Sequence, residues 1–252
     1  MEPREEAKRL AQLLAESRYA VVFTGAGVST ESGIPDFRGP SGLWRRVPPE
    51  VFTIEYFVER PLEVWRLFTE LFYSFKDAKP NPAHYAIARL EELGIVKSVI
   101  TQNIDGLHQA AGSRRVIELH GNLRWARCMS CGRRVPLDEA VSEAREGRLP
   151  RCPVCGGLLK PDAVFFGEPL PEEALEEAFR EARRADLVLV VGSSLSVYPA
   201  AYIPEYARRR GARLAIVNLE PTPLDHLATV VARRRASELL LMVVRELESL
   251  AG

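Results

Sequence analysis

The sequence has no excess of charge of either sign, no long apolar run and few cysteines. Lysine plus arginine and aspartate plus glutamate both count 34, so the formal net charge is zero. A uniformly basic surface for nucleic acid is therefore not expected. The longest apolar runs, 20–23 and 187–191, are far too short to cross a bilayer, and the charged N-terminus does not resemble a signal peptide. These absences predict a cytoplasmic protein without membrane contact, whose four cysteines need an explanation other than disulfides.

Short apolar runs alternate with amphipathic stretches along most of the chain. The runs are expected to be buried strands, at 20–24, 97–101, 116–119, 187–192, 213–218 and 229–232. The amphipathic stretches have apolar residues every three or four positions and are expected to be helices, at 2–16, 82–93, 171–183, 199–210 and 237–249. This alternation predicts an α/β fold with a doubly wound, Rossmann-like parallel sheet covered by helices on both faces.

Two stretches interrupt the alternation. Residues 39–80 are rich in aromatic side chains and have a helical pattern from Pro61 onward, and residues 124–160 contain all four cysteines. We expect both to be insertions that together form a small domain. The main domain would then consist of residues 1–38, 81–123 and 161–252.

The cysteines form two C-x-x-C pairs, Cys128 with Cys131 and Cys152 with Cys155, which are twenty residues apart. A glycine follows the second cysteine of each pair, where a left-handed backbone costs little. Four thiolates at this spacing suit a closed tetrahedral zinc shell, and a shell without an open position is structural. Two redox dithiols or two disulfides are the alternatives. Residues 124–160 are thus expected to form a zinc ribbon beside the helical insertion.

A glycine-containing loop, Thr24-Gly25-Ala26-Gly27-Val28-Ser29-Thr30, follows the first expected strand. Glycines at such a turn let a phosphate approach the backbone, and a helix N-terminus supplies N–H donors. A plain tight turn is the alternative, because the complete G-x-G-x-x-G is absent. Two later strands also end in polar or glycine residues, Gly192-Ser193-Ser194 and Asn218-Leu219-Glu220. Since ligands bind at the carboxyl ends of parallel strands, the three ends together favour a dinucleotide.

His120 directly follows the expected strand 116–119, at the end of the sheet where ligands should bind. Imidazole titrates near neutral pH and is suited to general-base catalysis. A structural or surface role is the alternative. The other three histidines, His84, His108 and His226, do not have this position in the sequence.

Taken together, these motifs resemble the sirtuin (Sir2-type) family. The G-A-G-x-S-x-x-S-G-I-P-D-F-R stretch runs from Gly25 to Arg38 without a gap. After it, in the family's order, come T-Q-N-I-D at 101–105, H-G-N at 120–122, the two C-x-x-C pairs, V-F-F-G-E at 164–168, G-S-S-L at 192–195 and N-L-E at 218–220. The resemblance covers residues 21 to 220. It implies NAD as cosubstrate, a structural zinc, and an acyl-lysine protein or peptide substrate, with nicotinamide, O-acyl-ADP-ribose and free lysine as products.

The resemblance also implies roles for single residues. His120 would be the catalytic base, and Asn103 would act beside it on a water or hydroxyl. Asp105 and the Ile104 backbone would hold the nicotinamide carboxamide, and Gln102 would contact the nicotinamide ribose. From the residues alone, Asn103 and Asp105 could equally belong to an Asx-type turn.

The NAD site implied by the resemblance gathers residues from several loops. Phe37 would shield the reactive carbon from water, and Arg38 would meet a phosphate or an acidic neighbour; a core aromatic beside a surface arginine is the alternative. The complete expected set is Gly25, Ala26, Gly27, Thr30, Phe37, Arg38, Gln102, Asn103, Ile104, Asp105, His120, Gly192, Ser193, Ser194, Asn218, Leu219, Glu220 and Ala236.

Two edges resemble those between which the family binds its peptide as an added strand. Their expected contacts are Val164, Phe165, Gly167, Glu168, Val197 and Tyr198. Val164 and Phe165 could equally be plain core residues. Relatives that prefer succinyl groups carry a Tyr and, three residues later, an Arg, where the best alignment here places Phe68 and Leu71. Acetyl or longer apolar acyl groups are therefore expected. This expectation depends on the alignment, because Tyr73 and Arg66 are nearby and a shift of one helical turn would undermine it.

Two other functions share parts of this pattern. ADP-ribose transfer to a protein side chain would use the same cleavage of NAD. A non-catalytic NAD sensor or nucleic-acid-binding zinc ribbon would leave His120 dispensable. The arginine clusters at 208–210 and 233–235 are interpreted as a helix end and a solvated turn rather than as a nucleic-acid patch.

Overall fold

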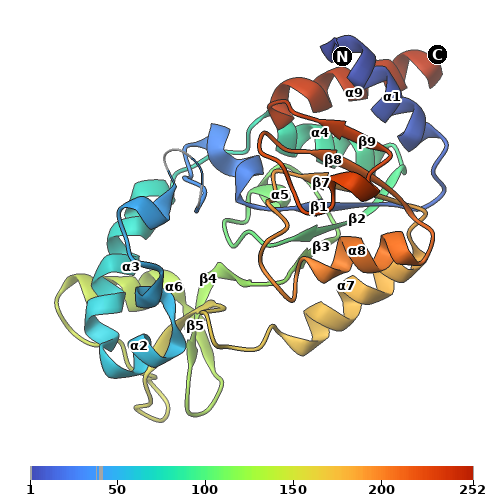
Figure 1. The fold of residues 1–252 in the computed structure, drawn as a ribbon. Coiled ribbons are helices and arrows are strands. Elements are labelled where there is room, and N and C mark those ends of the chain that lie inside the picture. The colour runs from blue at the N-terminus through green and yellow to red at the C-terminus, as the bar shows by residue number, and fades with distance from the viewer. Residues whose placement is uncertain (1, 38, 40–41, 252) are drawn as a thin grey trace.

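The computed structural model describes residues 2–37, 39 and 42–251, and its larger part is built on a six-stranded parallel sheet (Figure 1). The strand order is β3-β2-β1-β7-β8-β9. The bounds are β1 Ala20–Thr24, β2 Val96–Thr101, β3 Val116–Glu118, β7 Leu187–Val191, β8 Arg213–Val217 and β9 Val230–Ala232. All six expected strands are confirmed. The chain starts in the middle of the sheet and extends it first to one side and then to the other, so the connections diverge beside β1, where ligands of such sheets bind.

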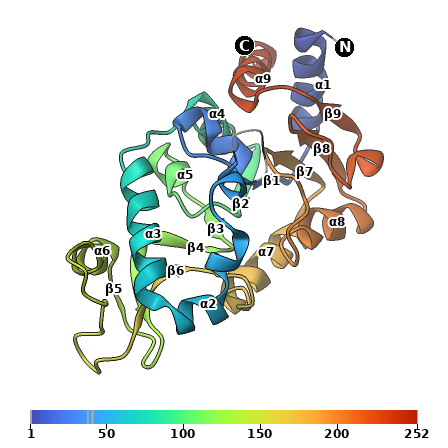
Figure 2. The ribbon, with the colours of Figure 1, turned by 60° about the vertical axis from the view of Figure 1, so that its left-hand side comes forward.

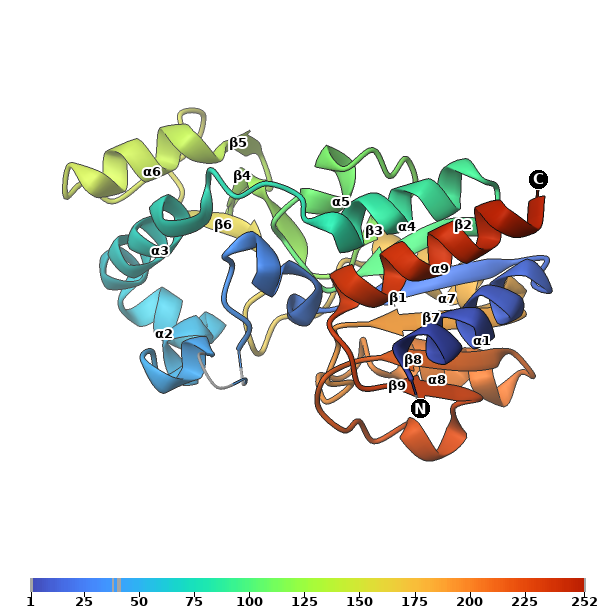
Figure 3. The same ribbon diagram turned by 90° about the horizontal axis from the view of Figure 1, so that it is seen from above.

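Helices cover both faces of this sheet (Figure 3). Helices α1 Pro3–Ala15, α4 Pro82–Glu92 and α9 Ala236–Ala251 lie on one face, and α7 Glu172–Arg184 and α8 Tyr202–Arg209 on the other. Strand β1 shows why both faces are apolar: Val22 packs with the first group, and Val21 and Phe23 pack with the second. The five expected helices and the doubly wound α/β architecture are confirmed.

The small domain combines an antiparallel sheet with three helices (Figure 2). The sheet order is β5-β4-β6, with β4 Gly121–Cys128, β5 Arg134–Pro136 and β6 Leu159–Ala163. The helices are α2 Ile54–Glu59, α3 Pro61–Phe75 and α6 Leu137–Arg145. Trp65 of α3 is fully buried, and its Nε1 donates to the Leu159 carbonyl at 2.9 Å. This contact joins the helical insertion to the ribbon.

The remaining short elements lie in the connections between these helices and strands. Helix α5 spans Leu107–Ala110, and 3₁₀ helices span Ala26–Ser32, Leu43–Arg45, Pro49–Phe52 and Asp225–Leu227. Strands β4 and β6 cross the domain boundaries expected at 123/124 and 160/161. The division into domains stays a prediction, and the antiparallel sheet favours moving those two boundaries to 120/121 and 163/164. Within the described residues, no helix is both long enough and apolar enough to cross a membrane.

Candidate active site and metal centre

The loops after β1 and β7 lie in close contact at the carboxyl edge of the sheet. The Gly27 N–H donates to the Gly192 carbonyl at 2.8 Å, and the Gly25 N–H donates to Val191 at 3.2 Å. Gly192 has φ +60°, and a Cβ there would lie 2.3 Å from the Val28 nitrogen. A side chain at Gly192 would therefore separate the loops. Because the two glycine N–H groups are used within the protein, the expected phosphate contacts of Gly25 and Gly27 stay a prediction.

A polar network occupies the same edge, at the ends of β1 and β2. The Ser29 hydroxyl donates to Asp105 Oδ2 at 2.7 Å and accepts from Asn103 Nδ2 at 3.1 Å. Asp105 Oδ1 accepts from the Leu107 N–H at 2.9 Å. Gln102 Nε2 donates to the Ser193 hydroxyl at 2.8 Å, which brings in the end of β7. The structure thus places four residues of the expected NAD site together, and the Asx-type turn at Asp105 is also present.

Two buried histidines support this network, and the sequence reasoning did not assign them to the site. The His84 Nε2 lies 3.3 Å from the Ser29 hydroxyl, and the His108 Nε2 lies 2.9 Å from the Thr24 hydroxyl. Their rings are 4.9 Å apart. Burial lowers the pKa of both histidines, and that of His108 to about 3. Both rings are therefore neutral at pH 7.

One of these histidines could have been found from its place at the start of a helix. The His84 Nδ1 accepts from the Asn81 N–H at 3.2 Å, and the Asn81 side chain caps α4. With Nδ1 as acceptor, the neutral ring carries its proton on Nε2 and donates to Ser29. The sequence shows an Asn three residues before a His at the start of an expected helix, and this pattern would have predicted that the two side chains form a capping box.

His120 lies just beyond β3 with a defined protonation pattern. Its Nδ1 is 2.9 Å from the Gln102 carbonyl oxygen, which can only accept, so Nδ1 carries the proton. The unprotonated Nε2 then keeps a lone pair. Burial lowers the pKa of His120, so the neutral form dominates at pH 7. The geometry equips this ring to accept a proton at Nε2.

A cavity of about 390 Å³ lies between the two domains, next to the polar network. Ile104, Asp105 and Ile34 line it from the large domain, and Phe72 and Leu137 from the small one. The expected nicotinamide contacts Ile104 and Asp105 therefore line this cavity, which is partly open to solvent.

The other expected NAD contacts are more dispersed. Phe37 is 41% exposed and its ring centroid lies 5.0 Å from that of Trp44, so it is not a core aromatic; Arg38 lies outside the described residues. The loop that follows β8 is exposed at Leu219 and Glu220. Ala236 begins α9, which contacts the 3₁₀ helix Ala26–Ser32 that contains Thr30.

The expected peptide edge at 164–168 is held on one side by the small domain. The Phe166 N–H donates to the Phe52 carbonyl, and the Ile54 N–H donates to the Phe166 carbonyl, both at 2.9 Å. Phe165 is buried against Phe52 and Phe57, so its side chain has the position of a core residue, which was the alternative to a peptide contact. Gly167 is exposed. On the opposite edge, Tyr198 is 51% exposed and Val197 is half-buried.

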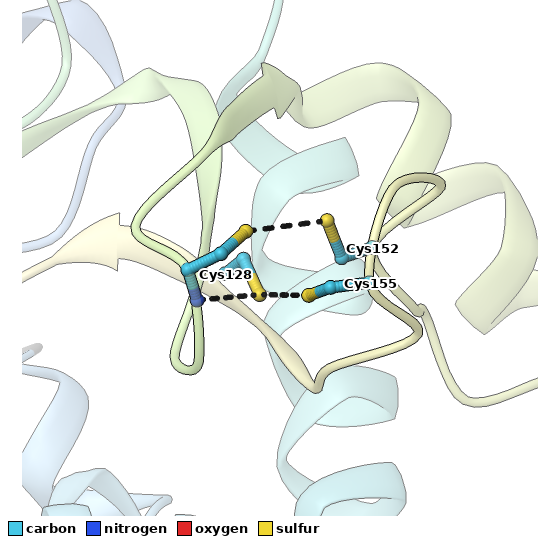
Figure 4. Close-up of side chains that lie close together, drawn as sticks. Cys128, Cys152 and Cys155 are labelled. Carbon is cyan, nitrogen blue, oxygen red and sulfur yellow. Dashed lines mark hydrogen bonds between the residues drawn. The ribbon is translucent and has the colours of Figure 1, made fainter.

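The four cysteines form a compact cluster where the turn after β4 meets the turn before β6; Figure 4 labels Cys128, Cys152 and Cys155. All four sulfurs lie within 4.8 Å of one another, with Cys128 and Cys155 at 3.5 Å and Cys131 and Cys152 at 3.7 Å. These separations are too long for disulfides, and all four cysteines are free. Zn–S bonds of about 2.3 Å in a tetrahedron put neighbouring sulfurs about 3.8 Å apart. The cluster therefore fits a structural metal held by four thiolates.

A doubly wound parallel sheet, polar strand ends at one edge and an inserted metal ribbon together define a Rossmann-like α/β protein with a structural metal centre. A sequence model described as the Sir2 family matches residues 25–199. The chain belongs to the Sir2 family.

Similar proteins span nearly the whole chain. The "NAD-dependent protein deacetylase 1" of Pyrobaculum aerophilum is 54% identical over 236 residues, which cover 94% of this chain and 92% of the relative. A structure of a Sir2 enzyme is 50% identical with a TM-score of 0.91, covering 98% of this chain and 99% of the other. A complex of Sir2 with a p53 peptide and NAD+ is 45% identical with a TM-score of 0.89, covering 95% of this chain and 97% of the other.

Proposed function

We propose that this chain is an NAD-dependent protein-lysine deacetylase or deacylase, which gives nicotinamide, O-acyl-ADP-ribose and free lysine. The observation that carries the proposal is the geometry of His120, whose Nδ1–H is bound to the Gln102 carbonyl, while Nε2 has no hydrogen-bond partner among the described residues. Membership of the Sir2 family and the names of the relatives support the same activity. A general base at a carboxyl strand edge has no evident use in a non-catalytic NAD sensor.

NAD fits the donor set at this edge. Bound NAD would supply the electrophile, because loss of nicotinamide leaves an electron-poor ribose carbon that the substrate's acyl oxygen can attack. Asp105 and the Ile104 backbone would hold the carboxamide, and Ser29 keeps Asp105 in place by its hydrogen bond. Gln102 and Asn103 would orient the ribose hydroxyls, and His120 Nε2 would take a proton from one of them.

The remaining loops would complete the cosubstrate site. The glycine loop around Ala26, with Thr30, would face the phosphates, and Arg38 would contribute its charge there. The adenosine half of NAD would contact the remaining residues of the expected set, which are Ser194, Asn218, Leu219, Glu220 and Ala236. Phe37, exposed beside Trp44, would cover the reactive carbon and exclude water.

The substrate would bind as an extended strand between Gly167–Glu168 and Val197–Tyr198. Gly167 is exposed, and among the described residues its backbone N–H has no partner, so it can pair with a peptide carbonyl. Phe68 stands where relatives that prefer succinyl groups carry a Tyr. It is 6% exposed and packs against Trp65. Neither Phe68 nor Leu71 can bind a carboxylate, so acetyl or longer apolar acyl groups are the proposed substrates.

The zinc held by Cys128, Cys131, Cys152 and Cys155 would be structural, since four thiolates fill its tetrahedral shell. The cytoplasmic location and the absence of nucleic-acid binding stay predictions from the sequence.

The decisive experiment is a mass-resolved assay with an acetyl-lysine peptide and NAD. His120→Ala should lose about 10²–10⁴-fold in rate, which is the usual contribution of a positioned general base. His226→Ala is the matched control, because this exposed histidine lies in the 3₁₀ helix Asp225–Leu227, away from the strand ends of β2 and β3. Wild-type activity of His120→Ala, or ADP-ribosylated protein without deacylation, would refute the proposal.

A further inference from the structure

Lys160 is a buried cation in the small domain that the proposed chemistry does not use. It is 7% exposed, and its Nζ donates to the carbonyls of Pro161 at 3.0 Å and Ala163 at 2.6 Å. The same Nζ lies 2.9 Å from Glu168 Oε2. An ammonium group has three N–H donors, so each of them has an oxygen acceptor here.

Keeping this charge in the core is costly. Burial lowers the pKa of Lys160, and the Glu168 carboxylate opposes that shift. The nearest ring is Phe165, whose centroid is 4.4 Å from Nζ. A well-packed apolar residue at such a position is often as stabilising as a buried ion pair, so stability alone does not account for the lysine.

The acceptors of Lys160 belong to both ends of the segment 161–168. Glu168 Oε2 also accepts from the Phe165 N–H at 2.7 Å, and the Glu168 N–H donates to the Phe165 carbonyl at 3.0 Å. These bonds close a tight turn with Gly167 at its tip, where φ is +89°. One ammonium group therefore contacts both ends of the segment that contains Gly167, and Phe166 is held in addition by Phe52 and Ile54.

The same segment is attached to the rest of the site. The Val164 N–H donates to the His120 carbonyl at 2.9 Å. On the other side, β6 places Lys160 opposite Arg127 of β4 in the antiparallel sheet. The next residues along these strands, Leu159 and the metal ligand Cys128, are also opposite each other. Lys160 thus lies between the metal ribbon and the proposed base, at the root of the peptide edge.

We propose that Lys160 is a positioning residue for the acyl peptide: through Ala163 and Glu168 it holds the 164–168 turn in the shape that pairs with the substrate backbone. This inference rests on the proposed deacylase function. Lys160 touches neither the NAD contacts nor the acyl group, so its removal should weaken peptide binding and leave the chemical step intact.

The test is steady-state kinetics of Lys160→Met with an acetyl-lysine peptide and NAD. The peptide KM should rise by about tenfold or more, with kcat, the KM for NAD and the zinc content within about twofold of wild type. Lys160→Arg, which keeps the charge and the donors, should recover the peptide KM to within about threefold. An unchanged peptide KM in Lys160→Met, or equal losses in both KM values and zinc content, would overturn the inference.

A second variant keeps the test decisive if Lys160→Met does not fold. Glu168→Gln preserves the side-chain volume but removes the carboxylate charge that faces Lys160, and it should raise the peptide KM in the same way. Where both single variants fold, the double variant should be no worse than the worse single one, since both changes break one interaction. Additive effects would refute the coupling. Absence of deacylation by the wild-type protein would instead refute the proposed function, so the two failures are distinguishable.

Discussion

Glu181 offers a quantitative test of how burial sets the strength of an ion pair in this fold. Its side chain is fully buried on α7 and accepts from the Tyr19 hydroxyl at 2.8 Å, the Ser98 hydroxyl at 2.9 Å and the Arg115 guanidinium at 2.9 Å. Glu177, one turn earlier, pairs with the same guanidinium at 3.1 Å but has a side chain that is 35% exposed. The two carboxylates share a partner and differ in burial.

Glu181→Ala should cost about 3–5 kcal/mol of unfolding free energy, because the Ser98 and Tyr19 hydroxyls each lose a hydrogen bond to a charged acceptor, about 1.5–3 kcal/mol apiece. The Arg115 side chain is 40% exposed and stays hydrated, so its loss of a partner adds little. Glu177→Ala should cost about 0–1 kcal/mol, since water screens an exposed pair. For a chain of this size the first change corresponds to a melting temperature lower by about 6–20 °C.

Guanidinium denaturation at pH 7, followed by circular dichroism, measures both variants under one set of conditions. The difference between the two unfolding free energies is the informative quantity. Both variants lose one carboxylate from α7, so the effect of that shared change cancels and the effect of burial remains. Equal destabilisation of the two variants, or a loss below about 1 kcal/mol for Glu181→Ala, would refute the argument from burial.

Three further predictions concern the site. Because burial lowers the pKa of His120 below its ordinary value of 6.5 and its neutral form is the base, the acid-side decline of kcat/KM should have its midpoint below pH 6.5; a decline centred above pH 6.5 would contradict this. Cys152→Ser should lose zinc and lower the melting temperature, as should prolonged chelation of the wild type, and unchanged metal content would exclude a structural zinc. A succinyl-lysine peptide should react at least about tenfold more slowly than an acetyl one, and Phe68→Tyr with Leu71→Arg should narrow that gap; efficient desuccinylation by the wild type would show the expected register to be wrong.

The pattern of apolar residues was enough to predict the main sheet. Each of its strands is a short run buried on both faces, and such runs between amphipathic helices leave few arrangements other than a doubly wound sheet. The metal centre was predictable for a similar reason, since two C-x-x-C pairs carry their geometry in their spacing. By contrast, strands β4 and β6 were not predicted, because their alternation is short and their partners lie far apart in the sequence.

The sequence by itself determined the strand order along the chain, the four metal ligands and the place of His120 at a strand end, because these depend on local pattern and spacing. Only the tertiary structure decided that the His84 and His108 rings contact Ser29 and Thr24, and that the buried Lys160 lies against Glu168. The histidine contacts join residues from separate elements. Their energy comes from burial and from hydrogen bonds that exist only once the elements have packed together, and no local pattern encodes them.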